Sequence, residues 1–504
     1  MRAGGIVAAF GAALIALGVS AAPAGAATPD ELDGFEYVAL GDSYSAGFGL
    51  TPFSATSPFT ATPSTEANGC YQADANYPHL LAGDLGLAID DQTCSGAISA
   101  NLGYPGSTTL PVPPTDPVLP TLPAGSEVET TMNGQIDPQL QTASLGPTTD
   151  IVTVAIGGND LGFSDIAEGC IRLDDSSGSF ATGLQFLGGV EVENCQSYFD
   201  DAGTYPNADL QDRLDTYVVP RIAAVLDEIA AAAPNAQVFV VGYPEIATAD
   251  PALAASCFSS PIPPATNTVP FSGTDIEFIH GVEGLLNAAL ESQAAAHGFH
   301  FVSTEASTTG HALCDPEPWI QGLTVQLPSG SPATCPAGYL PLGRDGTTYV
   351  CVELGALHPN ADGVANLRAV VEPAIQAAFG VSVSNASPAA GDSITVTGTG
   401  FYPNESVAIE LRSTPVLLAT ATADASGSFT ATVTVPSGTA AGAHEIVATG
   451  AASGHAFADP ITVAGPALAA TGIDPLPPLL LGLCLVTTGF LLVVVRSRRR
   501  DTAR

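Results

Sequence analysis

Residues 35–45 read FEYVALGDSYS, an apolar run followed by Gly41, Asp42 and Ser43. The run has the length and composition of a buried strand. A serine directly after such a strand is held at a tight turn, with its hydroxyl at the carboxyl edge of a sheet, where open α/β folds bind ligands. His358 follows more than 300 residues later, in the sequence HPNADG. A histidine in a late loop is the natural base for such a serine, so the two residues predict serine-ester hydrolysis.

The chain around this motif alternates short apolar strands with amphipathic helices as far as residue 380. Strands are predicted over residues 35–40, 151–156, 238–242 and 299–302, and helices over 209–233, 275–297 and 362–379. This alternation indicates a parallel sheet with helices on both faces. Residues 103–126, 194–208 and 259–274 are predicted to form loops, because they are rich in proline, threonine and other turn-forming residues.

The charge of the chain excludes one class of partner. The 504 residues contain 12 Lys and Arg against 50 Asp and Glu, for a formal net charge of −38. Such a surface repels nucleic acid and anionic membranes, and no basic patch is present to overcome the repulsion. We therefore expect no nucleic-acid partner, and we interpret the charge as favouring solubility.

The N-terminal segment has the features of a secretory signal. Arg2 precedes an apolar stretch over residues 6–19, and the small residues Ala24, Gly25 and Ala26 follow. These features predict a signal peptide over residues 1–27, cleaved near Ala26 or Ala27. The alternative is an N-terminal membrane anchor, which the short apolar stretch disfavours.

Eight cysteines lie in the part of the chain that would be exported: Cys70, Cys94, Cys170, Cys195, Cys257, Cys314, Cys335 and Cys351. An even number of cysteines in an oxidising compartment predicts disulfides. The simplest arrangement pairs neighbours in order, and the sequence leaves the other connectivities open. No histidine or cysteine cluster has the spacing of a zinc site, so we predict neither a metal nor a cofactor.

The pattern changes after residue 380 to short alternating segments separated by turn residues. Strands are predicted over residues 393–397, 406–412, 428–435 and 445–449. This spacing is typical of a small all-β sandwich of the immunoglobulin-like class over residues 381–464. We expect this domain to act as a spacer.

The C-terminus combines three signals. A linker over residues 465–478 contains Leu468, Ala469, Ala470, Thr471 and Gly472, an apolar run spans residues 479–495, and an arginine-rich tail spans 496–504. The apolar run is near the short limit for a transmembrane helix, and the arginines mark its cytoplasmic end. The pentapeptide resembles the Leu-Ala-x-Thr-Gly signal of actinobacterial sortases. This resemblance implies cleavage after Thr471 by a sortase and linkage to cell-wall peptidoglycan, and a permanent membrane anchor is the alternative.

Two further motifs could supply hydrogen-bond donors beside Ser43. Gly96, in the sequence CSGA, could bring a bare backbone N–H close to a substrate, and Asn159 follows two glycines directly after the strand predicted over residues 151–156. Ester hydrolysis needs donors aimed at the tetrahedral oxyanion, and losing one typically costs about 2.7–4 kcal/mol. The Ser43 N–H, the Gly96 N–H and the Asn159 side chain would supply three.

These four blocks, in this order, resemble the SGNH (GDSL-type) hydrolases. The resemblance covers about residues 35–380 and is nearest to secreted, disulfide-stapled lipases and esterases of actinomycetes. It implies a three-layer, flavodoxin-like domain over residues 28–380. It also implies that Ser43 forms an acyl-enzyme, that His358 is the base, and that Ser43, Gly96 and Asn159 form the oxyanion hole.

One position departs from the pattern of the family. Most members carry Asp three residues before the histidine, and this chain has Gly355 there. Some of the actinomycete enzymes orient their histidine with a backbone carbonyl at this position. The resemblance therefore implies that the Gly355 carbonyl accepts the proton on Nδ1 of His358. Glu353 is the alternative orienting group, and we favour the carbonyl because fixing the tautomer requires an acceptor but not a charge.

The leading interpretation is a monomeric lipase or esterase at the cell surface, with a lipid or short-chain acyl ester as substrate. Two alternatives remain open at this point. The same fold hosts carbohydrate esterases that deacetylate polysaccharide, and the chain could be a non-catalytic, wall-anchored adhesin or binding protein.

Overall fold

The computed structural model describes residues 25–53, 70–103, 138–162, 166, 170–172, 210–330, 334–344 and 347–465. Several predictions concern residues outside these ranges. They are the apolar part of the signal peptide, almost all of the loop at 103–126, the loop at 194–208, the sorting pentapeptide from Leu468 to Gly472 and the apolar run at 479–495. None of the helices within the described ranges is long and apolar enough to cross a membrane.

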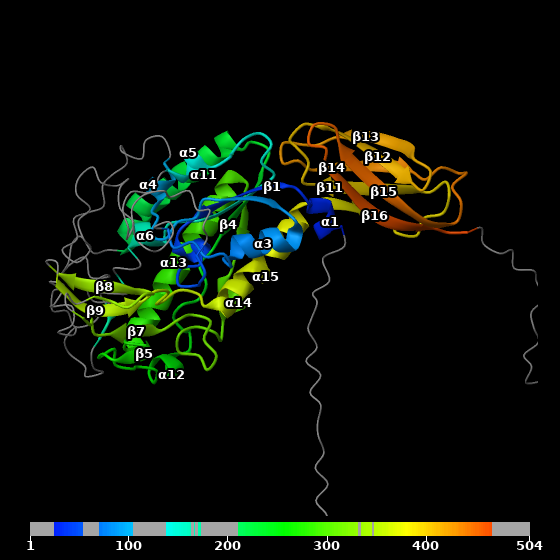
Figure 1. The fold of residues 1–504 in the computed structure, drawn as a ribbon. Helices are drawn as coiled ribbons and strands as arrows, with labels where there is room; N and C mark the ends of the chain where they lie inside the picture. The colour runs from blue at the N-terminus through cyan, green and yellow to red at the C-terminus, as the bar shows by residue number, and fades with distance from the viewer. Residues whose placement is uncertain are drawn as a thin grey trace, which may run out of the picture.

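A five-stranded parallel sheet forms the centre of the N-terminal domain, with strand order β2-β1-β3-β4-β6 (Figure 1). The strands are β1 (Glu36–Gly41), β2 (Ala88–Asp91), β3 (Ile151–Ala155), β4 (Gln237–Val241) and β6 (His300–Val302). Four of them coincide with the predicted strands, and β2 was not predicted. The order is that of flavodoxin-like folds, in which the chain leaves β1 toward β2 on one side and β3 on the other. Such folds bind ligands at that point.

Alternate residues of each strand face opposite layers of helices, because successive side chains in a strand point to opposite sides. Val38, Val152 and Val240 belong to one core, together with residues of α11 (Val219–Ala232) and α13 (Gly273–His297). Tyr37, Ile151 and Phe239 belong to the other core, together with residues of α3 (Tyr77–Leu85) and α15 (Ala361–Ala378). The prediction of a parallel sheet covered on both faces is confirmed.

The remaining helices of this domain are short. They are α1 (Pro29–Leu32), α2 (Ser43–Ala46), α4 (Ser99–Leu102), α5 (Gln139–Thr142), α6 (Gly158–Leu161), α10 (Leu210–Arg213), the π-helical turn η1 (Leu214–Val218), α12 (Pro251–Ala254) and α14 (Glu305–Thr308). Three of them, α2, α4 and α6, follow β1, β2 and β3 in the chain. They carry or adjoin the motifs that the sequence singled out.

A small antiparallel sheet, with strand order β5-β7-β9-β8, lies on the side of the domain away from the C-terminal sandwich (Figure 1). Its strands are β5 (Ala265–Thr268), β7 (Leu323–Gln326), β8 (Tyr339–Arg344) and β9 (Thr347–Glu353). The prediction of a loop over residues 259–274 was wrong where β5 forms and where α13 begins. The segment ATNT has no apolar periodicity, and its pairing with β7 makes it a strand. Strand β9 leads into the loop that carries His358.

Disulfides close three loops of this domain, joining Cys70 to Cys94, Cys257 to Cys314, and Cys335 to Cys351. These pairs confirm three of the four expected bridges. Cys170 is also disulfide-bonded, and its expected partner Cys195 lies outside the described residues.

The C-terminal domain is a sandwich of two antiparallel sheets, with strand orders β10-β11-β14 and β13-β12-β15-β16. The strands are β10 (Gly380–Val383), β11 (Ser393–Thr399), β12 (Ser406–Arg412), β13 (Val416–Thr422), β14 (Phe429–Thr434), β15 (Gly442–Gly450) and β16 (Ala456–Val463). The four predicted strands correspond to β11, β12, β14 and β15. The pattern missed β10, β13 and β16.

The sandwich packs directly against the N-terminal domain, beside α1 (Figure 1). His455 lies between them: its Nε2 is 2.9 Å from Asp150 Oδ1, and its Nδ1 is 2.8 Å from the Gly400 carbonyl. The Phe35 ring stacks on the His455 ring at 4.4 Å, and Phe379 lies in the same buried cluster as the core of the sandwich. The two domains therefore share one continuous apolar core.

This interface makes His455 important for stability. Replacing His455 by Ala should remove about 2 kcal/mol from the free energy of unfolding, because buried Asp150 loses a hydrogen-bond partner. Thermal unfolding of the two proteins measures the difference. His444→Ala is the matched control. His444 lies in the same domain, and its hydrogen bonds to Ser413 and the Ala440 carbonyl are exposed at the surface. Equal melting temperatures for His455→Ala and the parent would contradict the importance of this contact.

Candidate active site

Ser43 begins α2, directly after the turn that ends β1. Asp42 caps the helix, because its side chain accepts a hydrogen bond of 3.0 Å from the Tyr44 N–H. The turn requires glycine at position 41, where φ is +144° and a Cβ atom would lie 2.6 Å from the Ala155 carbonyl oxygen. The backbone thus fixes Ser43 at the carboxyl edge of the sheet, as the sequence predicted.

A buried amide holds this turn from the side. The Gly41 N–H donates to Gln139 Oε1 and the Gly41 carbonyl accepts from Gln139 Nε2, both at 2.9 Å. Gln139 lies in α5 and is 1% exposed. Its side chain pairs with Gly41 as a neighbouring strand would, two residues before Ser43. Gln139 was not predicted from the sequence, because a single glutamine in a short helix carries no recognisable pattern.

The structure brings Ser43 and His358 together. Ser43 Oγ lies 2.7 Å from His358 Nε2, and His358 Nδ1 lies 2.9 Å from the Ala356 carbonyl oxygen. Because a carbonyl can only accept, Nδ1 carries the proton and the lone pair of Nε2 faces the serine hydroxyl. In this tautomer Nε2 is able to accept a proton from the Ser43 hydroxyl.

The expected orienting group was wrong by one residue. The Gly355 carbonyl accepts from the backbone N–H of His358, at 3.0 Å, and the Ala356 carbonyl takes the place expected for it at Nδ1. Glu353, the alternative, accepts a hydrogen bond of 3.3 Å from Gln321 instead. The reason is a tight turn over residues 355–358, which commits the Gly355 carbonyl to closing the turn.

Gly355 matters for a different reason. A Cβ atom on Gly49 would lie 2.4 Å from the Gly355 Cα, and one on Gly355 would lie 2.9 Å from the Gly49 Cα. The loop after α2 and the loop of His358 therefore meet through two bare backbones. Larger residues at this contact would push the histidine away from Ser43.

Two aromatic rings and a backbone pair hold His358 in place. The Tyr44 ring lies 4.7 Å from the His358 ring and the Phe48 ring 4.9 Å from it, centroid to centroid. The Tyr44 hydroxyl donates to the Leu357 carbonyl at 2.9 Å. The backbone of Gln321 bonds to both the Leu357 N–H and the His358 carbonyl. The role of Tyr44 was not predicted from the sequence, although its position directly after the serine places it at the site.

The two other blocks follow the strands on either side of β1. Gly96 follows β2 with φ of +83°, beside the Cys70–Cys94 disulfide, and Asn159 lies in α6 after β3. Asn159 Nδ2 donates one hydrogen bond, at 2.9 Å, to the Ala97 carbonyl, and this bond ties the two blocks together. No described residue accepts a hydrogen bond from the backbone N–H of Ser43 or Gly96. Both donors are thus available to a ligand as far as the described residues go.

Asp160 fastens the Asn159 block further. It is 2% exposed, and its carboxylate accepts from both the backbone N–H and the hydroxyl of Ser99, at the start of α4. The Asp160 carbonyl accepts from the Arg213 guanidinium, at 2.8 and 3.1 Å. Asp160 therefore braces the turns and does not face the Ser43 hydroxyl.

Residues 39–365 match the sequence profile of the GDSL-like lipase/acylhydrolase family. The chain belongs to this family. It is a carboxylic-ester hydrolase of the lipase and esterase type. Residues 377–463 match a macroglobulin-like domain, which agrees with the antiparallel sandwich.

Several known proteins are similar to this member of the family. It is 30% identical to Lipase 2 of Streptomyces coelicolor, over 61% of this chain and 83% of the lipase. It is 29% identical to Lipase 1 of the same organism, over 63% of this chain and 85% of that protein. The crystal structure of an extracellular lipase from Streptomyces rimosus aligns with a TM-score of 0.39 and 23% identity, covering 67% of this chain and 99% of the lipase.

Burial sets the charge of His358 in this family member. It lowers the pKa of the imidazole to about 4, and the hydrogen bond to the Ala356 carbonyl offsets only part of the effect. The ring is therefore neutral at pH 7, the form in which an imidazole can accept a proton. Burial also raises the pKa of Asp42, to about 7.

The lowered pKa of His358 predicts an unusual pH profile. The base acts only when neutral, so kcat/KM should persist as the pH falls and decline near pH 4 instead of near pH 6.5. Rates on a soluble ester between pH 3 and 8 measure this. Asp42→Asn removes the other carboxyl that titrates in this range. It also changes the hydrogen bond to Tyr243, so the comparison uses the pH at which the rate declines and not the size of the rate. A decline centred at pH 6.5 in both proteins would show that His358 is not held neutral by burial.

Proposed function

We propose that Ser43 and His358 are the catalytic pair of an exported serine esterase that acts on apolar acyl esters. The single observation that carries this proposal is the hydrogen bond of 2.7 Å between Ser43 Oγ and His358 Nε2. His358 Nε2 takes the Ser43 proton as Oγ attacks the ester carbonyl. The same nitrogen then gives the proton to the leaving alcohol.

The second half of the reaction uses the same groups. His358 removes a proton from water as the water oxygen attacks the acyl carbonyl. The ester bond to Ser43 Oγ then breaks, His358 returns the proton to Oγ, and the acid leaves. In both halves the oxyanion accepts hydrogen bonds from the Ser43 N–H, the Gly96 N–H and the second hydrogen of Asn159 Nδ2. The Ala356 carbonyl stabilises the imidazolium that forms transiently, without a full negative charge.

An apolar cluster beside His358 supports an acyl ester as the substrate. Phe48, Tyr71 and Leu354 form a small buried cluster, and partly buried Phe53 packs on it. The Phe48 ring lies edge-on to the His358 ring. The cluster is buried and makes the surroundings of His358 apolar, and apolar surroundings beside the reacting atoms suit a hydrocarbon acyl group better than a sugar. The net charge of −38 also repels a carboxylate product more than a neutral ester.

The test is Ser43→Ala, assayed on nitrophenyl esters of increasing acyl length and on acetylated xylan. The variant should lose at least about 10³-fold in kcat on every substrate that the parent cleaves. The parent should have a higher kcat/KM for nitrophenyl esters than for acetylated xylan. Retained activity in the variant would refute the role of Ser43. A preference for xylan would favour the alternative function, a carbohydrate esterase that deacetylates polysaccharide.

The chain supplies an internal control for labelling with a covalent serine probe. Ser413 Oγ lies 2.7 Å from His444 Nδ1 in the C-terminal domain, and Ser413 is exposed. This pair has a similar contact distance but lies outside the buried edge of the parallel sheet. A phosphonate probe should therefore modify Ser43 and leave Ser413 unmodified in peptide maps.

Export and wall attachment complete the proposal. The disulfides support an oxidising compartment, and the segments over residues 1–27 and 465–504 have the features of a signal peptide and a sortase substrate. Thr471→Ala should move the protein from the peptidoglycan fraction to the membrane or the medium. Immunoblots of cell fractions measure this, and an unchanged distribution would argue for a membrane anchor.

A further inference from the structure

The hydroxyl of Tyr243 connects the two turns on which the proposed reaction depends. It accepts a hydrogen bond of 2.9 Å from the Gly158 N–H and donates one of 2.6 Å to Asp42 Oδ2. Asp42 directly precedes Ser43, and Gly158 directly precedes Asn159. One buried side chain, 4% exposed, therefore bridges the nucleophile turn and the Asn159 turn.

The direction of both hydrogen bonds is fixed by their partners. An N–H can only donate to the Tyr243 oxygen, and Asp42 in its ionised form, which predominates above its pKa of about 7, accepts the hydroxyl proton. The other oxygen of Asp42 accepts from the Tyr44 N–H, at 3.0 Å. Burial and the adjacent Asp42 raise the pKa of Tyr243 well above its usual value, so the hydroxyl stays a donor. The bridge has one arrangement that satisfies all three groups.

The backbone of Tyr243 is itself held on α13. The Tyr243 N–H donates to Asn287 Oδ1 at 2.8 Å, and Asn287 Nδ2 donates to the Tyr243 carbonyl at 3.0 Å. The Tyr243 ring also meets the Tyr44 ring edge-on, at 5.1 Å. The position of the hydroxyl is thus set by a long helix in the core and not by the turns that it joins.

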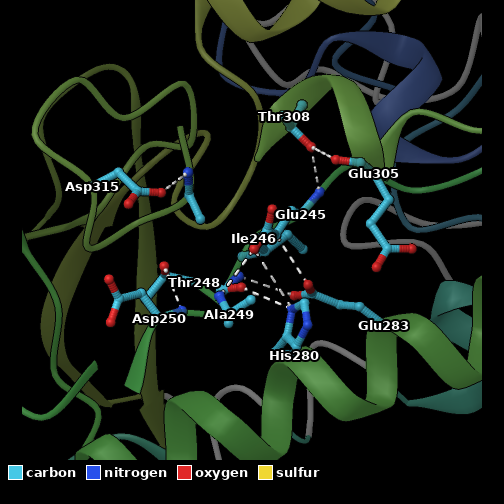
Figure 2. A network of polar contacts seen from close by, with 12 residues as sticks. Glu245, Ile246, Thr248, Ala249, Asp250, His280, Glu283, Glu305, Thr308 and Asp315 are labelled. Atoms are coloured by element: carbon cyan, nitrogen blue, oxygen red, sulfur yellow. Dashed lines mark hydrogen bonds and ion pairs between the residues drawn. The ribbon is translucent and has the colours of Figure 1, made fainter. Parts of the chain in front are cut away.

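The loop that follows Tyr243 is anchored in the same way (Figure 2). Buried Glu283 of α13 accepts from the Ile246 and Ala247 N–H groups, at 3.1 and 3.3 Å. The Glu245 N–H donates to Thr308 Oγ1, at 2.8 Å, and Glu245 Oε1 accepts from the Ala249 N–H at 3.0 Å. These contacts leave the end of β4 little freedom to move.

Gly158 allows the hydroxyl to approach. A Cβ atom at position 158 would lie 3.1 Å from both Cζ and the hydroxyl oxygen of Tyr243. This contact is tighter than ordinary van der Waals packing. The absence of a side chain at Gly158 therefore lets the Tyr243 hydroxyl reach the backbone next to Asn159.

We propose that Tyr243 is a positioning residue that sets the distance between Ser43 and the Asn159 oxyanion donor. This inference rests on the proposed function and goes beyond it, since Tyr243 touches no reacting atom. The Asn159 side chain donates to the oxyanion, which forms only after Ser43 has attacked. A shift of either turn therefore weakens binding of the transition state more than binding of the substrate.

The test is Tyr243→Phe, which removes the bridging oxygen and keeps the ring. We expect kcat on a nitrophenyl ester to fall about 10-fold or more, with KM changed less than about twofold, because Asn159 is displaced from the oxyanion. Tyr37→Phe is the matched control. Tyr37 is fully buried in β1, and its hydroxyl pairs with Thr153 at 2.8 Å without touching either turn. An equal loss of kcat in both variants, or an unchanged kcat in Tyr243→Phe, would overturn the inference.

A double-mutant cycle separates positioning from a general structural role. In an Asn159→Ala background, Tyr243→Phe should lower kcat by less than about twofold, because the donor that it positions is gone. If Tyr243→Phe lowered kcat by the same factor in the parent and in Asn159→Ala, the inference would be overturned. Gly158→Ala disturbs the same contact from the other side and should lower kcat similarly, which keeps the test informative if Tyr243→Phe folds poorly.

Ser43→Ala distinguishes the failure of this inference from the failure of the proposed function. If Ser43→Ala is inactive and Tyr243→Phe matches the parent, only the role of Tyr243 is refuted. If Ser43→Ala keeps its activity, the proposed function fails, and the role assigned to Tyr243 fails with it.

Discussion

A hydrogen bond of 2.7 Å joins Ser43 Oγ to His358 Nε2, across 315 residues of chain. Neither residue can reach the other through local structure. The serine is placed by the end of β1, and the histidine by the loop between β9 and α15. The two loops touch at Gly49 and Gly355, where any side chain would collide with backbone. The chemistry that we propose for the site thus depends on the close approach of two glycine backbones.

Among the described residues, no carboxylate accepts a hydrogen bond from His358. A backbone carbonyl fixes the tautomer of His358, and the rings of Tyr44 and Phe48 confine the imidazole. Apolar burial lowers its pKa to about 4, which a carboxylate neighbour would oppose. The arrangement favours a neutral base at rest and gives less stabilisation to the imidazolium during reaction. Precise positioning of the oxyanion donors therefore becomes more important.

Buried polar side chains supply that positioning. Gln139 pairs with the backbone of Gly41, Asp160 bonds to Ser99, and Tyr243 joins Asp42 to Gly158. Each of them connects segments that are distant in the sequence. The C-terminal sandwich acts at the opposite end of the sheet, because β1 runs from the interface at Glu36 to the nucleophile turn. A strand of this length spans about 20 Å, so the sandwich supports the core and does not reach the reacting atoms.

The sequence by itself determined the fold class, four of the five parallel strands and the four motif blocks. These features rest on local properties: apolar runs of strand length, helical periodicity, and glycines at turns. It also led to three of the disulfides, because the paired cysteines lie near each other along the chain. Strand β2 and the small antiparallel sheet escaped prediction, since their stability comes from pairing and not from an apolar pattern of their own.

Only the tertiary structure decided which groups hold the site in place. The acceptor for His358 Nδ1 is the backbone carbonyl of Ala356. Every residue type has such a carbonyl, so the sequence does not indicate which one is used. Gln139 and Tyr243 act through contacts with segments far along the chain, so no spacing in the sequence reveals them. His455 could not be distinguished from a surface histidine until the sandwich was seen to share its core with the N-terminal domain. Local sequence specifies turns and strands, whereas distances between remote side chains exist only once the chain is folded.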